Sequence, residues 1–319
     1  MSHLSLPDVR GPFPITDDDI APLNVVFSDA FTDRYRRDGM VGVRVPTLNH
    51  AIWKFSLADA GLGAMLWRDA DGGVAAFNVA HLSGTEGWMG PIAVRPDLQG
   101  RGVGKTVVRA GIDWLRGRGA AVIGLETMPR TVDNIGFYST LGFVAGPLTI
   151  TFTLTSANGE SVDRLGKYGP REQDALTAEM QLLTARSSYV HDFTREIRLT
   201  AELAIGDTVL LRARDELVGF ALCHTAPLVE GRVREELRVL KVVLADPMYV
   251  SAMARAIAAF ARESSTQRAA LRVQAGNDRV YRAIVGAGGR VRWTDLRMTL
   301  DGYPEHPTRC GIVLSNWEI

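Results

Sequence analysis

The stretch that decides the fold, residues 92–108, reads IAVRPDLQGRGVGKTVV. It begins with an apolar, strand-like segment, continues into a loop with glycines at positions 100, 102 and 104, and ends in a helical pattern. A helix that begins at a glycine-rich loop presents unpaired backbone amides at the positive end of its dipole. The stretch therefore predicts an anion-binding loop, and its spacing must decide which phosphate the loop holds.

Two familiar nucleotide motifs fit the loop poorly. A P-loop needs a glycine five positions before Gly104, where this chain has Gln99. The dinucleotide fingerprint needs a third glycine where Lys105 stands. A turn without a ligand is also disfavoured, because alternate glycines weaken a loop unless close backbone approach requires them. A nucleotide phosphotransferase stays open as a weaker alternative.

A third pattern fits better. Residues 99–104 match Gln/Arg-x-x-Gly-x-Gly/Ala, and VRPDLQGRGVGKTVV resembles the acyl-CoA-binding motif of the GNAT superfamily of N-acetyltransferases. NIGFYSTLGF, residues 134–143, is similar to the second signature of that family, so the resemblance covers about residues 61–154. It implies that the loop binds the diphosphate of coenzyme A, and that acetyl-CoA is the cosubstrate, without a metal.

The resemblance also implies which residues bind the cofactor. In the family, a bulge splays the strand before the loop from its neighbour, and the exposed backbone pairs with the pantetheine arm. A backbone amide there polarises the thioester carbonyl. The cofactor-binding residues implied in this way are Ile92, Ala93, Val94, Gln99, Gly100, Arg101, Gly102, Val103, Gly104, Lys105, Thr106, Asn134 and Tyr138.

Tyr138 is the first candidate catalytic residue. By resemblance it stands where GNAT enzymes often carry a tyrosine near the CoA sulfur as general acid. A core position is the alternative for Tyr138, and Asn134 is equally compatible with a helix start.

The general base is less clear. Many family members carry a glutamate on the strand before the loop, where residues 88–90 here read WMG. Glu126, at the end of the apolar segment AAVIGLE, is the candidate base. Glu86 is close but shifted, and a packing role is favoured for His81. A water relay, or an amine deprotonated in solution, stays open.

The remaining patterns predict alternating helices and strands. Helices are expected over residues 20–31, with Thr16 or Asp17 as cap, and over 50–56, 103–116 and 132–142. Strands are expected in a hairpin over 63–82 and at 120–125, and the alternation of LTITFTL, residues 148–154, predicts a half-buried strand. The segment 309–319 is expected to be a strand or a packed terminal segment.

The same order of segments occurs twice. VAAFNVAH, from position 74, matches LVGFALCH, from position 217, and the same offset pairs Tyr138 with Tyr281. The chain is therefore expected to be α/β (α+β), with two tandem GNAT-like domains, each a mixed, mostly antiparallel sheet flanked by helices. Residues 1–155 would be the acetyl-CoA-binding domain and 156–319 a degenerate copy, joined by a linker over 155–170.

The second copy lacks the glycine loop. At the same offset Gly102 falls on Ala245, and no glycine lies between Val233 and Ala275. The second domain is therefore expected to be non-catalytic, to bind no acetyl-CoA in this mode, and to wall off one side of the acceptor pocket.

The composition of the chain limits the classes of binding partner and the cellular location to be expected. The chain has 319 residues with 36 basic and 36 acidic side chains, which argues against nucleic-acid and membrane partners. Its two cysteines form no disulfide framework, and it shows neither a signal peptide nor a membrane span, so a cytoplasmic location is expected. The expectation is an acetyl-CoA-dependent N-acetyltransferase, monomer or homodimer, acting on a primary amine of a small molecule by direct transfer. The alternative is a CoA-binding or sensory protein without turnover.

Overall fold

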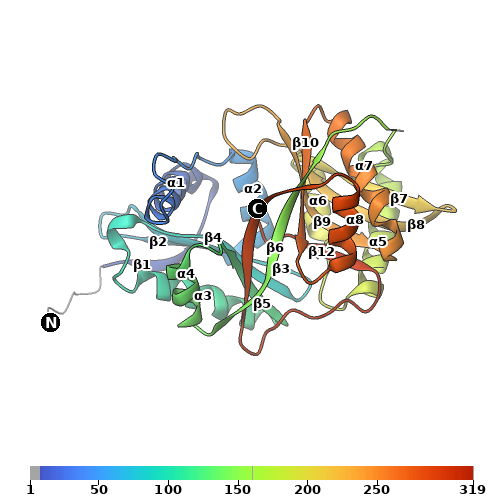
Figure 1. Cartoon of the computed structure of the whole chain (residues 1–319). Helices are drawn as coiled ribbons and strands as arrows, with labels where there is room; N and C mark the ends of the chain where they lie inside the picture. The colour runs from blue at the N-terminus through green and yellow to red at the C-terminus, as the bar shows by residue number, and fades with distance from the viewer. Residues whose placement is uncertain (1–7, 160, 319) are drawn as a thin grey trace.

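The computed structural model describes residues 8–159 and 161–318 (Figure 1). Its first half comprises β1 (Arg10–Pro14), α1 (Ile20–Arg37), α2 (His50–Ala60), β2 (Ala64–Arg68), β3 (Val74–Ser83), β4 (Glu86–Val94), α3 (Val103–Gly117), β5 (Val122–Thr127), α4 (Val132–Ser139) and β6 (Phe143–Thr155). The second half comprises α5 (Pro170–Ser187), α6 (Thr194–Glu202), β7 (Gly206–Ala213), β8 (Glu216–His224), β9 (Glu236–Leu244), α7 (Val250–Glu263), β10 (Arg268–Gln274), α8 (Asp278–Gly286), β11 (Arg290–Leu300) and β12 (Ile312–Ser315). The repeated order of elements confirms the expected duplication.

The two halves share one twelve-stranded mixed sheet, in the order β1-β2-β3-β4-β5-β11-β6-β10-β9-β8-β7, with β12 paired to β9. The last long strand of each half lies beside the other half. β6 pairs with β10, β11 pairs with β5, and β6 and β11 pair with each other at the centre of the molecule (Figure 1). The sequence did not predict this strand exchange.

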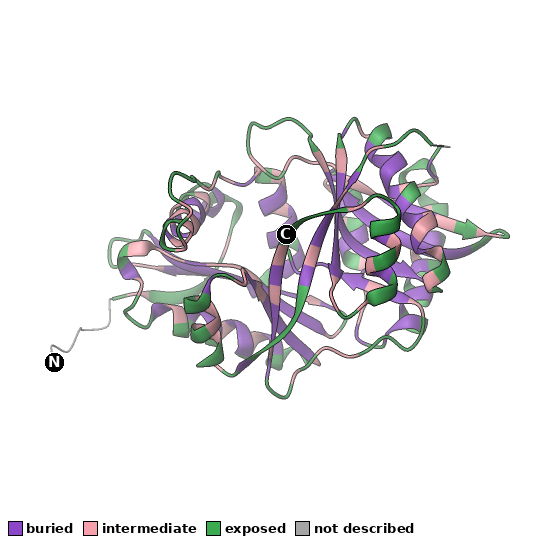
Figure 2. Ribbon diagram, in the orientation of Figure 1, coloured by how far each residue is buried: buried purple, intermediate pink, exposed green. Residues whose placement is uncertain are grey.

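Helices cover both faces of the sheet, and the strands between them are largely buried (Figure 2). In the first half, α1 and α2 pack on one face around Trp53 and Phe77, and α3 packs on the other around Val108 and Leu115. In the second half, α5 and α6 on one face, and α7 and α8 on the other, repeat this arrangement. Among the described residues, no helix combines the length and apolarity that a membrane crossing requires.

Several predicted elements differ from the structure in their bounds: α2 continues to Ala60 and α4 ends at Ser139. Two further differences have a clear physical cause. The first helix continues six residues beyond the predicted end, because Arg34–Asp38 and Arg37–Asp33 ion pairs, four residues apart, support its last turns. β6 is longer than predicted, and Thr149 and Thr151 are buried rather than solvent-facing. The strand exchange explains the burial of the two threonines, since it places this part of β6 between β10 and β11, whereas residues 144–148 of the same strand are exposed.

Candidate active site

The site begins where β4 and β5 separate. β3 pairs with β4 over the whole length of β4, from Glu86 to Val94, whereas β5 pairs only with residues Glu86 to Met89 of β4. At that point Gly90 and Pro91 together oppose the single residue Val79 of β3, which is a β-bulge. Within the described part of the chain, the segment 92–94 therefore has no strand partner on its second edge. The splayed strand implied by the resemblance is present.

The glycine loop lies beside this gap and leads into α3. Gly100 and Gly102 have φ of +74° and +86°, a left-handed conformation that favours glycine. A Cβ atom on Gly104 would lie 3.3 Å from the Cζ atom of Phe137 in α4. The first two glycines thus form the turn, and the third permits close approach. Because α3 begins at Val103, the backbone amides of its first turn lie at the edge of the gap.

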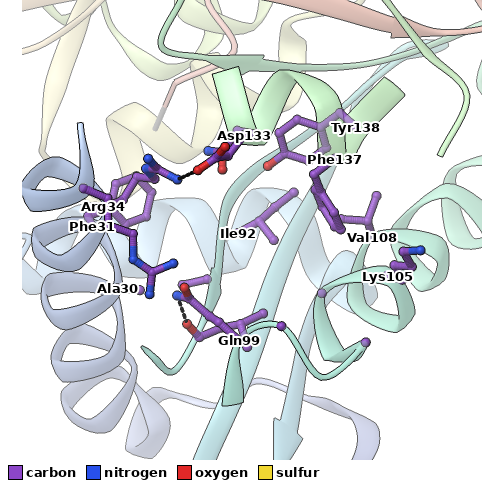
Figure 3. Close-up of a pocket in the computed structure, with 17 residues that line it drawn as sticks. Ala30, Phe31, Arg34, Ile92, Gln99, Lys105, Val108, Asp133, Phe137 and Tyr138 are labelled. Carbon is purple, nitrogen blue, oxygen red and sulfur yellow. Dashed lines mark hydrogen bonds and ion pairs between the residues drawn. The ribbon is translucent and has the colours of Figure 1, made fainter. Parts of the chain in front are cut away.

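A cavity of about 480 Å³ occupies the gap (Figure 3). Of the residues predicted to bind the cofactor, those that line it are Ile92, Ala93, Val94, Gln99, Gly100, Gly102, Gly104, Lys105, Asn134 and Tyr138. Three others do not line it: Arg101 and Thr106 are exposed, and Val103 is buried in a separate apolar cluster. The side chain of Gln99 donates a hydrogen bond to the carbonyl oxygen of Val94 at 2.9 Å, which ties the loop to the end of β4.

Sequence reasoning missed the wall that α1 supplies. Ala30, Phe31, Arg34 and Arg37 line the cavity from the last turns of this helix, beyond or at its predicted end. Arg34 reaches across to Asp133 of α4, with 3.1 Å between Nη1 and Oδ2 (Figure 3). The spacing of these four residues places them on one helical face, and this signal was available in the sequence.

Tyr138 stands at the inner end of the cavity, where it packs edge-on against Phe137 and Phe143. Burial raises the pKa of its hydroxyl to about 12. Tyr138 therefore keeps its proton at neutral pH and is available as a hydrogen-bond donor.

A second cavity, of about 350 Å³, meets the first along a wall that both share, lined by Phe31, Arg34, Ile92, Asn134 and Tyr138. Both halves of the chain form its walls, and the second half contributes Leu228, Val229, Arg272, Trp293, Asp295, Trp317 and Glu318. The second half thus forms part of the wall of this cavity, and the use of the cavity as an acceptor pocket stays a prediction.

Glu126 lines the second cavity but is fully engaged. It forms ion pairs with Arg272 and Arg297 of the second half and accepts a hydrogen bond from Thr149. Burial by itself raises the pKa of Glu126, but the two guanidinium groups outweigh burial, and the pKa lies below its ordinary value. A carboxylate held in this way is a poor proton acceptor.

The other two candidate bases are not in either cavity. Glu86 is buried and accepts hydrogen bonds from Ser315 and Trp317, at 2.6 and 3.0 Å. His81 is also buried, with Nδ1 at 2.6 Å from Asp59 and Nε2 at 3.2 Å from the carbonyl oxygen of Gly90. His81 thus contacts the backbone of the bulge at Gly90. Across the described ranges, no three His, Cys, Asp or Glu side chains gather as they would around a metal ion.

The second half repeats the separation of strands but fills the gap. β9 pairs with β10 only over residues Glu236 to Val239, which parallels the four paired positions of β4 and β5. β8 occupies one edge of β9 from Arg238 to Leu244, so β12 must use the other edge, where it pairs with residues Lys241 to Leu244. α7 begins at Val250, so the counterpart of Gly102 is Tyr249, rather than the Ala245 given by the sequence offset.

Comparison with known proteins agrees with this architecture. Residues 31–143 match the family described as Acetyltransferase (GNAT) family. Ribosomal protein bS18-alanine N-acetyltransferase of Salmonella typhimurium is 36% identical over 74 residues, which is 23% of this chain and 50% of that protein. The chain thus spans about half the length of the curated relatives it matches.

Two solved structures share the fold over nearly the whole chain. A Pyrococcus horikoshii protein, solved as a candidate acetyltransferase, has a TM-score of 0.68 at 17% identity, with 99% of this chain and 97% of that one covered. A tandem GNAT protein from the clavulanic acid biosynthesis pathway has a TM-score of 0.61 at 12% identity, with 93% and 100% covered. At such low identity, the likeness shows the duplicated fold alone.

Proposed function

We propose that the chain is an acetyl-CoA-dependent N-acetyltransferase that acts on a primary amine by direct transfer, because residues 31–143 match the Acetyltransferase (GNAT) family. We assign activity to the first domain, residues 1–155, and a non-catalytic role to residues 156–319. The observation that carries the proposal is the open gap between β4 and β5, with a cavity of about 480 Å³ beside the glycine loop. The second gap is filled by β12.

Cofactor binding follows from the geometry of the gap. The diphosphate would lie at the N-terminus of α3, where Gly100 and Gly102 leave the amides uncovered and Lys105 adds a positive charge. The pantetheine arm would run along the unpaired edge of segment 92–94 and bring the thioester toward Tyr138.

The chemistry needs a neutral amine and a stabilised leaving group. The amine nitrogen attacks the thioester carbonyl carbon, the C–N bond forms, the C–S bond breaks, and the nitrogen loses the proton that the thiolate finally takes up. Full proton transfer from Tyr138 is unfavourable, because its pKa of about 12 exceeds the value of about 8.5 for an ordinary thiol. We therefore assign to Tyr138 a hydrogen bond to the departing sulfur.

We assign a positioning role to Glu126 in place of the general-base role that the sequence favoured. Its carboxylate holds Arg272 at the wall of the second cavity and also pairs with the buried Arg297. The acceptor then loses its ammonium proton to water. A rate that keeps rising with pH toward the pKa of the free amine, about 10 for an alkylamine, is the expected signature.

Replacement of Tyr138 by phenylalanine is expected to lower kcat by about 10- to 100-fold, since a hydrogen bond to a charged group contributes about 1.5–3 kcal/mol. The Kd for acetyl-CoA should change little. Thiol release over a panel of amines measures the effect, with Tyr281→Phe, a partly buried tyrosine of α8 in the second half, as matched control. Tight CoA binding without thiol release from the unaltered protein would instead favour the alternative, a CoA-binding or sensory protein.

Titration calorimetry is expected to find one acetyl-CoA per chain. In the second half the edge of β9 that would face the pantetheine arm already pairs with Ile312 to Ser315. Two equivalent sites per chain would contradict the assignment of activity to the first half.

A further inference from the structure

The strand β12 leads from the second half into the acceptor side of the first. Its Ile312 and Leu314 pack into the core beneath α7 and α8, and they leave a cavity of about 10 Å³, about the smallest that holds a water. Directly after β12, Trp317 and Glu318 line the second cavity. The gap between β4 and β5 in the first half is open, whereas the equivalent gap between β9 and β10 in the second half holds β12.

Buried polar contacts fix the end of β12. The Lys241 ammonium donates to the Ser315 hydroxyl at 2.8 Å and to the Asn316 carbonyl oxygen at 3.1 Å. The Asn316 amide donates to the carbonyl oxygen of Leu240 at 2.9 Å. Ser315 in turn donates to Glu86 of β4 at 2.6 Å. Because Glu86 belongs to the first half, these contacts tie the segment to both halves.

Trp317 is held rigidly against the active half. Only 3% of it is exposed, its indole N–H donates to Glu86, and the guanidinium carbon of Arg297 lies 3.8 Å from its ring centroid. The ring occupies the space above Gly124 in β5, where an added Cβ would lie 2.2 Å from it. Glycine inside this strand is therefore explained by the indole that covers it.

Glu318 brings negative charge to the same cavity. Its carboxylate lies 2.8 Å from Arg272, which also pairs with Asp295 and Glu126. Glu126 has Arg297 as a second partner, whereas Asp295 and Glu318 have Arg272 as their cationic partner within the described residues. Burial is the main cause that raises the pKa of Asp295 to about 7. The negative charges of Glu318 and Glu126 raise this pKa further, whereas Arg272 lowers it. A positive group in the cavity would relieve this repulsion.

The cavity has two chemically different ends. One end is shared with the cofactor cavity at Phe31, Arg34, Ile92, Asn134 and Tyr138, where the reacting amine must lie. The Arg34 guanidinium at this end is paired with Asp38 and Asp133. The carboxylates of Asp295 and Glu318, with the half-exposed Trp293, come from the second half and line only the acceptor cavity.

We propose that residues 312–318 form the acceptor-recognition element of the enzyme, and that the acceptor carries a second cationic group besides its reacting amine. β12 anchors the element in the unused gap of the second half, Trp317 forms the wall against which the acceptor lies, and Glu318 attracts its second charge. This inference rests on the proposed acetyltransferase function.

Steady-state thiol release tests the charge assignment with alkyl diamines against amino alcohols of the same length. In the unaltered protein kcat/KM should be higher for the diamines. Glu318→Gln should raise KM for diamines about two- to fivefold, leave amino alcohols unchanged, and leave KM for acetyl-CoA unchanged. Glu179→Gln, on the exposed face of α5, is the charge-matched control. Equal effects on both acceptor classes, or none, would overturn the assignment.

Trp317 is tested separately. Trp317→Ala should lower kcat/KM for every acceptor by about 10- to 100-fold without changing the Kd for acetyl-CoA, and Trp317→Phe should restore part of it. If Trp317→Ala does not fold, Trp317→Phe alone must still shift the acceptor KM, and an unchanged KM would refute the role. If the unaltered protein binds acetyl-CoA but releases no thiol, the proposed function fails. The recognition element is then tested by calorimetry on the acetyl-CoA complex, which should bind diamines more tightly than amino alcohols. Equal affinity for the two classes would refute the recognition element.

Discussion

Gly102→Asp is expected to abolish stabilisation of the protein by acetyl-CoA and to lower thiol release by at least about 100-fold. The residue has φ of +86° directly before α3, and the amides of that helix turn are the proposed diphosphate contacts. A carboxylate there would repel the diphosphate and cover the amides. Aspartate adopts left-handed backbone more readily than most residues, so the variant should still fold.

Thermal unfolding with and without acetyl-CoA measures this effect. A ligand at 100 times its Kd stabilises the folded state by about 2.7 kcal/mol, and this increment should disappear in the variant. Gly119→Asp is the matched control, because Gly119 also has positive φ, of +76°, with open space around it just past the far end of α3. Equal stabilisation of both variants by acetyl-CoA would show that the loop does not hold the diphosphate.

The first half alone, residues 1–159, is expected not to fold to a soluble, cofactor-binding protein. Without the second half, β5 loses its partner β11, and β6 loses both of its neighbours. Glu126 would lose Arg272 and Arg297, and removal of partners from a buried charge costs about 3–5 kcal/mol. Such losses are comparable with the whole stability of a typical domain, about 5–15 kcal/mol.

Solubility, near-ultraviolet circular dichroism and acetyl-CoA binding of the fragment provide the measurement. Co-expression with a fragment that begins at residue 161 should restore a soluble complex, since the exchanged strands are held by hydrogen bonds and packing. Cleavage of the folded chain within the exposed segment 156–159 should leave the complex intact. A cooperative unfolding transition of the first fragment alone would contradict the expectation.

Local patterns in the sequence predicted much of the molecule. The glycine spacing located the loop between β4 and α3, and the repeated VAAFNVAH and LVGFALCH segments predicted the duplication. These features depend on residues close together in the chain, where turn chemistry and periodicity act. The sequence offset of the repeat is nevertheless wrong at the loop. Gly102 directly precedes α3, and the residue that directly precedes α7 is Tyr249 rather than Ala245.

The features that the sequence did not predict depend on pairing between distant strands. From the sequence, Glu126 is expected to be a free carboxylate at the end of a strand. Its pKa is lowered by Arg272 and Arg297, which are 146 and 171 positions away along the chain. Likewise, the apolar run of residues 312–314 is compatible with any open sheet edge, and only the assembled sheet selects β9. The partner of a strand is a property of the whole fold.

The exchange of β6 and β11 also sets the order in which a nascent chain can mature. All the residues of the cofactor loop have been synthesised long before residues 290–300, which supply the neighbour of β5. Until then, β5 and β6 present unpaired edges, the kind of surface that recruits other strands. The first half therefore cannot complete its sheet ahead of the second, and the glycine loop gains its final support only after residues 290–300 have been synthesised.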